Sequence, residues 1–181
     1  MEESFDNLTS LLIYPLVASV SFYEIYNLDD TVFSHTSITE NLVYFMCLRF
    51  FFHFFLCEKT EYKIHHFSFA VCLYYMTITK RLHYYAALSF LMEFTQIPLI
   101  FYLKTKKIIW GIMLWLFFVM FRFGVIYFAI ISHLKDSYKI TFFENFLSKA
   151  IIAIMVLLNG YWFFLINKKI WKKCREAQKL S

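Results

Sequence analysis

The sequence predicts an all-α, multi-pass membrane protein. Hydrophobic residues make up 60% of the chain and occur in long blocks, whereas charged residues make up only 17%. A soluble domain of this length covers its surface with polar side chains, and this chain has too few of them. Glycine and proline are scarce, and short segments of alternating hydrophobicity are absent, which argues against a β-barrel. Because hydrocarbon offers the backbone no hydrogen bonds, each apolar block is expected to be a helix.

Six membrane spans are expected, in one continuous domain. The fifth and sixth blocks are long enough for the roughly 20 residues that a bilayer core requires. The second and third are short, so we expect them to extend into their flanks or to lie in a locally thinner bilayer. The six blocks are Leu11–Tyr26, Leu42–Cys57, His65–Thr79, Tyr84–Tyr102, Ile108–Ile131 and Phe146–Ile166.

The distribution of Lys and Arg predicts the orientation of these spans. One side carries eleven basic residues, six of them from Lys168 onward, and the other side carries five, namely Lys80, Arg81, Lys135, Lys139 and Lys149. The positive-inside rule therefore places both termini in the cytosol. The basic tail is expected to lie against anionic lipid headgroups, so its charge requires no nucleic-acid partner.

Several polar side chains fall inside the predicted spans, where a charge costs about 2.5–3.5 kcal/mol on insertion scales. Helical spacing places them on stripes that we expect to face one another or a cavity. Glu93 is expected to be ionised and paired with Arg122, Arg49 or both. A buried network that fixes helix register and a functional site both remain open. The expected network comprises Arg49, His53, Ser89, Glu93, Gln96, Arg122 and Asn159.

His65 and His66 open the third span. Adjacent residues on a helix point about 100° apart, so one of them at most is expected to face a given cavity squarely. Two histidines at a membrane interface are often headgroup-facing polar residues. A metal site is not expected, because the six histidines lack the HxxxH and HxxHH clusters of membrane di-iron enzymes and no carboxylate is spaced to complete a two-histidine site.

The order of these motifs resembles the TLC-domain family, which includes ceramide synthases, TRAM translocon-associated proteins and lipid-homeostasis proteins of the endoplasmic reticulum. The likeness rests on the histidine pair, on "FLMEFTQIPLIF", on the lone arginine of "VMFRFGVIYF" and on "LLNGYWFFLINKKIWKK". It is greatest to the smaller TLC-domain proteins. Their pattern HH…ExSxP…R corresponds to His65, His66, Glu93, Thr95, Gln96, Pro98 and Arg122.

The resemblance implies a bundle or barrel of about six transmembrane helices around an apolar cavity. It divides the chain into a cytosolic N-terminus (1–7), a TLC-like domain (8–173) and a basic cytosolic tail (174–181), and it implies the endoplasmic-reticulum membrane. The partners expected are membrane lipids with long acyl chains. Oligomeric state is not predicted.

The resemblance leaves two functions open. The first is sphingolipid or acyl-chain binding in lipid homeostasis. The alternative is a ceramide-synthase-like N-acyltransferase, with no cofactor besides acyl-CoA as co-substrate and with His65 or His66 as general base or acyl acceptor. The HDxxD motif of ceramide synthases is absent from the following helix, which reads "AALSFLMEFTQIP". This absence slightly favours the first function.

Overall fold

The structure is a computed structural model that describes residues 2–29, 32–58 and 60–178. Over these residues it consists of helices and short connections, without a strand, which confirms the all-α class. The elements are α1 (Glu2–Asn27), α2 (Ser37–Leu56), α3 (Thr60–Thr79), α4 (His83–Phe90), η1 (Leu91–Thr95), α5 (Gln96–Thr105), α6 (Ile108–Phe117), η2 (Phe118–Phe123), α7 (Gly124–Asp136) and α8 (Phe142–Gln178).

These elements form six helical rods. The fourth predicted span is α4, η1 and α5 following one another without a break, and the fifth is α6, η2 and α7. Among the described residues, three rods are long and apolar enough to cross a membrane by length and composition: His83–Thr105, Ile108–Asp136 and Phe142–Lys173. The chain is therefore a helical membrane protein. For α1, α2 and α3, membrane crossing stays a prediction from the sequence.

Two irregular turns interrupt the fourth and fifth rods at the same place. The segment η1 is a 3₁₀-helix, and Pro98 follows it closely. Proline has no backbone N–H, so the carbonyl of Phe94 lacks its usual partner four residues on, which explains the local departure from α geometry. The segment η2 is a π-helix, a form that occurs frequently at functional sites. The two segments pack against each other, and they carry Glu93 and Arg122.

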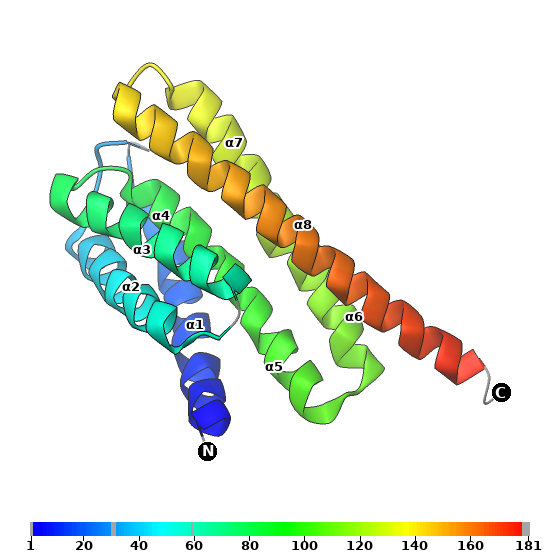
Figure 1. The fold of residues 1–181 in the computed structure, drawn as a ribbon. Coiled ribbons are helices and arrows are strands. Elements are labelled where there is room, and N and C mark those ends of the chain that lie inside the picture. Colours follow the sequence, from blue (N-terminus) through cyan, green and yellow to red (C-terminus); the bar gives the residue numbers. More distant parts are fainter. Residues whose placement is uncertain (1, 30–31, 59, 179–181) are drawn as a thin grey trace.

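A continuous apolar core joins most of the rods. It includes Val17 of α1, Met46 of α2, Leu73 of α3, Phe90 of α4 and Met155 of α8. Figure 1 shows α2 and α3 as a hairpin on one side of the molecule and α6, α7 and α8 as a long hairpin on the other. The turn between α7 and α8 lies at one end, and the turn between α5 and α6 lies at the opposite end (Figure 1).

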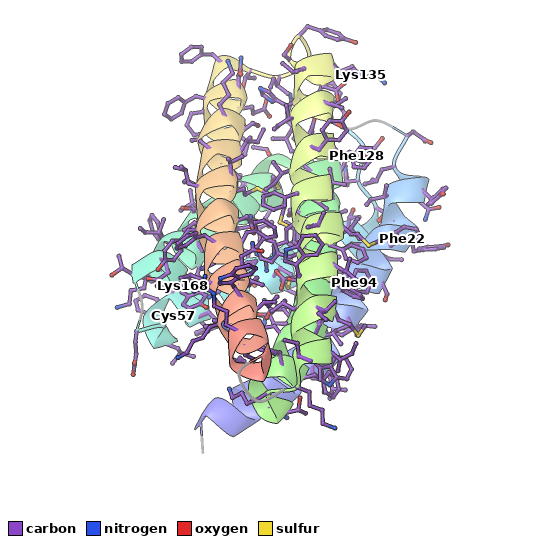
Figure 2. All side chains as sticks on the ribbon, turned by 90° about the vertical axis from the view of Figure 1, so that its right-hand side faces the viewer. Phe22, Cys57, Phe94, Phe128, Lys135 and Lys168 are labelled. Atoms are coloured by element: carbon purple, nitrogen blue, oxygen red, sulfur yellow. The ribbon has the colours of Figure 1, made fainter. Side chains whose placement is uncertain are left out.

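The outer surface is rich in large apolar side chains. Phe22, Phe52 and Phe128 are more than half exposed, and Phe22 and Phe128 point away from the helices in Figure 2. A water-soluble protein rarely exposes contiguous apolar area on this scale. In a bilayer the same side chains face lipid tails, which are equally apolar. The surface therefore matches the membrane environment that the composition predicts.

An ion pair between a half-buried arginine and a buried carboxylate fixes the end of the molecule that contains the α7–α8 turn. Arg81, between α3 and α4, donates to Glu144 of α8 through Nε (2.6 Å to Oε1) and Nη2 (3.0 Å to Oε2). Its guanidinium also lies over the Phe33 ring, with 4.4 Å between Cζ and the ring centroid. The hydrogen bond to Glu144 raises the pKa of Arg81. The guanidinium of Arg81 thus connects the α3–α4 turn to the start of α8 by a bidentate contact and to the α1–α2 connection through the Phe33 ring.

Removal of the Glu144 charge should loosen this end. In Glu144→Gln the guanidinium of Arg81 loses a charged acceptor, so we expect about 1–3 kcal/mol lower unfolding free energy. Thermal unfolding in detergent, followed by tryptophan fluorescence, measures the difference. Lys135→Gln, at an exposed position of α7 (Figure 2), is the matched control and should unfold like the wild type. Equal stability of both variants would show that the ion pair contributes nothing.

Candidate functional site

An internal cavity of about 360 Å³ lies between the helices. This volume is within the range of ligand-binding pockets, which is about 300–1,000 Å³. Its walls come from α1, α2, α3, η1, α5, α6, η2 and α8. The polar and small residues among those that line it are Tyr14, His53, Cys57, Tyr62, His65, His66, Glu93, Thr95, Gln96, Tyr102, Gly111, Arg122 and Lys169.

Three histidines form one wall of this cavity. The rings of His65 and His66 have centroids 5.2 Å apart, and those of His66 and His53 are 5.3 Å apart. His65 also contacts the Trp162 ring of α8 edge-on, at 5.5 Å. His66 is 8% exposed. Its Nδ1 is buried without a hydrogen-bond partner among the described residues.

Both members of the histidine pair line the cavity, although the helical spacing predicts that one at most faces it squarely. The reason is the width of the cavity. It extends from α2, where His66 meets His53, around the start of α3 to α8, where His65 meets Trp162. Side chains that diverge by about 100° on α3 can therefore border the same space.

Arg122 occupies the π-helix and is held by two neutral oxygens. Its Nε donates to Thr95 Oγ1 and its Nη1 to Asn159 Oδ1, both at 3.0 Å. Asn159 in turn donates to the carbonyl of Met155, and the hydroxyl of Thr95 donates to the carbonyl of Met92, each at 2.8 Å. The fourth, fifth and sixth rods are thereby connected through one buried guanidinium.

The geometry of Glu93 and Arg122 differs from the expected ion pair. Both side chains line the cavity, and each residue is 6% exposed. Among the described residues, no ion pair within 4 Å joins Glu93 to Arg122. Arg122 and Arg49 act on Glu93 electrostatically at longer range instead. The prediction of a direct Glu93–Arg122 ion pair is therefore wrong. Thr95 and Asn159 bind the guanidinium instead and hold it at a fixed position.

The remaining predicted residues divide between this cavity and other surroundings. His53 and Gln96 line the cavity. Arg49 lies against the Tyr14 ring, with 4.7 Å between Cζ and the ring centroid. Ser89 donates to the carbonyl of Ala86 and lines a second cavity of about 70 Å³. A 3₁₀ turn rotates each residue by about 120° instead of 100°, so η1 removes Ser89 from the face of Glu93 and Gln96.

Several buried polar residues were not predicted from the sequence. Glu24, His83, Asp136 and Glu144 are almost completely buried near the ends of helices. Glu24 accepts a hydrogen bond from the hydroxyl of Thr36. Their signal in the sequence was weak, because a polar residue at the end of an apolar block is expected to lie in the interfacial region. Within the described residues, no group of three or more His, Cys, Asp or Glu side chains is arranged to hold a metal ion.

The fold and the cavity define a class: a helical membrane protein with an internal ligand-sized chamber that carries histidines and a buried arginine. The family model described as TLC domain matches residues 4–168. The chain therefore belongs to the TLC-domain family. Comparisons with curated proteins and with solved structures gave no match.

The hydrogen bond from Arg122 to Asn159 should contribute measurably to the free energy of unfolding. In Asn159→Leu the guanidinium loses a buried acceptor, so we expect about 1–3 kcal/mol lower unfolding free energy. Asn167→Leu is the matched control on the same helix, because Asn167 accepts from Trp115 Nε1 (3.1 Å) at an exposed position. Its loss should cost clearly less. Thermal unfolding of both variants in the same detergent compares them, and equal losses would contradict the role of Asn159.

Proposed function

We propose that this protein binds lipid acyl chains in the cavity and acts in lipid homeostasis, with sphingolipids or other acyl-chain lipids as its ligands. The observation that carries the proposal is the cavity of about 360 Å³ between the helices. Besides its polar groups, aliphatic side chains line this space: Leu99, Ile100, Leu103, Leu114, Leu165, Ile166 and Ile170. Such a wall favours the burial of methylene groups, by about 0.8 kcal/mol for each one.

The proposed location is the endoplasmic-reticulum membrane, with both termini in the cytosol. The charge distribution supports this orientation. Lys106 of the α5–α6 turn accepts, through its carbonyl, a hydrogen bond from Lys173 of α8. The basic end of α8 and the basic α5–α6 turn therefore meet at the end of the molecule toward which the cavity extends. A lipid-facing site near anionic headgroups would benefit from this charge.

A second candidate function is N-acylation of a long-chain amine by acyl-CoA. The specific observation that favours it is that both histidines of the pair line the cavity. In this reaction the amine nitrogen attacks the thioester carbonyl carbon and the carbon–sulfur bond breaks. An imidazole accepts the proton of the amine and passes it to the departing thiolate. The two candidates share one binding site and differ in whether the histidines react.

Filling of the cavity should weaken chain binding. Gly111 lines the cavity, and a Cβ added there would lie 3.2 Å from Cε2 of Tyr102. In Gly111→Leu we expect binding of a tritiated fatty alcohol to fall at least about tenfold, because the new side chain occupies the site of several methylenes. Gly160→Leu is the matched control, since Gly160 is exposed with open space around it. Equal binding by both variants would place the lipid elsewhere.

Reconstitution with acyl-CoA and a labelled long-chain base separates the two candidates. If the protein is an acyltransferase, the wild type forms product, and His65→Ala/His66→Ala loses at least about 10²-fold in rate, the usual contribution of a general base. If the protein only binds lipid, neither the wild type nor the double variant forms product, and both still bind the acyl chain. Thermal unfolding must first show that the double variant is as stable as the wild type, because His66 is buried and its replacement can destabilise the fold.

A further inference from the structure

The cavity contains a cation whose hydrogen-bonding capacity is only partly used. A guanidinium has five N–H donors, and Arg122 directs one from Nε to Thr95 and one from Nη1 to Asn159. Toward the described residues, the other three make no hydrogen bond. Arg122 lines the cavity, and its Nη2, which has no hydrogen-bond partner among the described residues, is not among the sealed, unpartnered atoms, so the two N–H groups of Nη2 are accessible.

The guanidinium is also held in a fixed orientation. Besides its two acceptors, it lies near the rings of Phe118 and Trp162, with 5.3 Å between Cζ and each ring centroid. A planar, oriented guanidinium matches the geometry of carboxylate and phosphate oxygens. Burial of a cation without a direct counter-ion is costly, and an anionic ligand at Arg122 would reduce that cost. The site is thus preorganised for anionic oxygens.

Glu93 limits how strongly this site attracts an anion, because its carboxylate lines the same cavity and acts electrostatically on Arg122. It does not occupy the open donors, since its contact with the guanidinium is not direct. Recognition at Arg122 therefore combines charge with hydrogen bonds. A head group with anionic oxygens would satisfy donors that Glu93 leaves open.

The size of the cavity indicates how many chains it takes. At about 30 Å³ for each water-sized group, a volume of about 360 Å³ holds roughly twelve such groups. A methylene is of similar size, so the cavity accommodates most of one long acyl chain, and a second chain would have to lie outside it. We therefore expect lipids with a single chain to fit the cavity better than the two-chain phospholipids of the bilayer.

The arrangement of the lining residues indicates the orientation of the ligand. From Arg122 toward Gly111, about 17 Å along the fifth rod, the side chains on α5, α6 and α8 are mainly aliphatic. Lys169 at that end is exposed, so its ammonium reaches the surface. The opposite orientation would place a chain terminus against Arg122, Glu93 and the histidines, where it would leave buried donors without partners.

From these observations, and building on the proposed chain-binding function, we propose that the cavity binds a single-chain lipid with an anionic head group head-first. The carboxylate or phosphate oxygens bind the open N–H groups of Arg122, and the chain extends toward the α5–α6 turn. Charge-assisted hydrogen bonds from the open N–H groups of Arg122 distinguish such a lipid from an uncharged alcohol of the same length.

Binding of tritiated palmitate and hexadecanol to the full-length protein in detergent tests the proposal. The wild type should bind palmitate about tenfold to a hundredfold more tightly than hexadecanol, because a hydrogen bond to a charged group is stronger than one to a neutral group. Hexadecyl phosphate should compete with palmitate, and dipalmitoyl phosphatidic acid should not. Equal affinity for palmitate and hexadecanol would overturn the anionic preference, and competition by the two-chain lipid would overturn the single-chain selection. Binding of neither palmitate nor hexadecanol would instead contradict the chain-binding function itself.

An isosteric variant identifies the anchor. Asn159→Asp places a carboxylate on the Nη1 of Arg122 without a change in size, so we expect the preference for palmitate over hexadecanol to fall to about twofold or less, with hexadecanol binding retained. Asn167→Asp, at an exposed position of α8, is the control and should keep the full preference. Arg122→Gln should abolish the preference in the same way. A preference that survives in Asn159→Asp would show that Arg122 is not the anchor.

Discussion

A buried guanidinium organises the interior of this membrane protein. Arg122 lies on the fifth rod, and its two hydrogen bonds reach the fourth rod through Thr95 and the sixth through Asn159. Hydrocarbon cannot solvate such a group, so the protein must supply acceptors from neighbouring helices. The two irregular turns, η1 shortly before Pro98 and η2 on the fifth rod, lie at the level of this guanidinium. The segments η1 and η2 face each other at the level where the guanidinium needs partners.

The cavity follows from the unequal extent of the helices on its two sides. The stacked rings of Tyr62 and Trp162, with centroids 5.6 Å apart, fix the start of α3 beside the middle of α8. From Trp162, α8 continues to Gln178, about 24 Å further along its axis. In Figure 1 the α2–α3 hairpin ends before the α5–α6 turn is reached. The histidine wall therefore borders one part of the chamber, and the aliphatic walls of α5, α6 and α8 border the rest.

The two ends of the molecule have different chemistry. At the α7–α8 end, Arg81 and Glu144 form a closed bidentate pair, so the charges satisfy each other and the turns are fixed. Around the cavity, Arg122 and Glu93 are held apart, and both remain accessible. Paired charges contribute to structure, whereas separated charges that line a cavity are available to a ligand. This contrast is the reason to assign function to the cavity and a structural role to the opposite end.

The sequence by itself determined the fold class, the position of the six helical rods and the TLC-domain family, because long apolar blocks and the order of a few polar motifs are local properties of the chain. It also identified Glu93, Arg122, His65 and His66 as unusual residues. Only the tertiary structure decided that all four border one cavity, that Arg122 binds Thr95 and Asn159 instead of Glu93, and that Ser89 faces elsewhere. Regular helical spacing could not show this, since a 3₁₀ turn and a π turn alter the direction of the side chains just where the site lies.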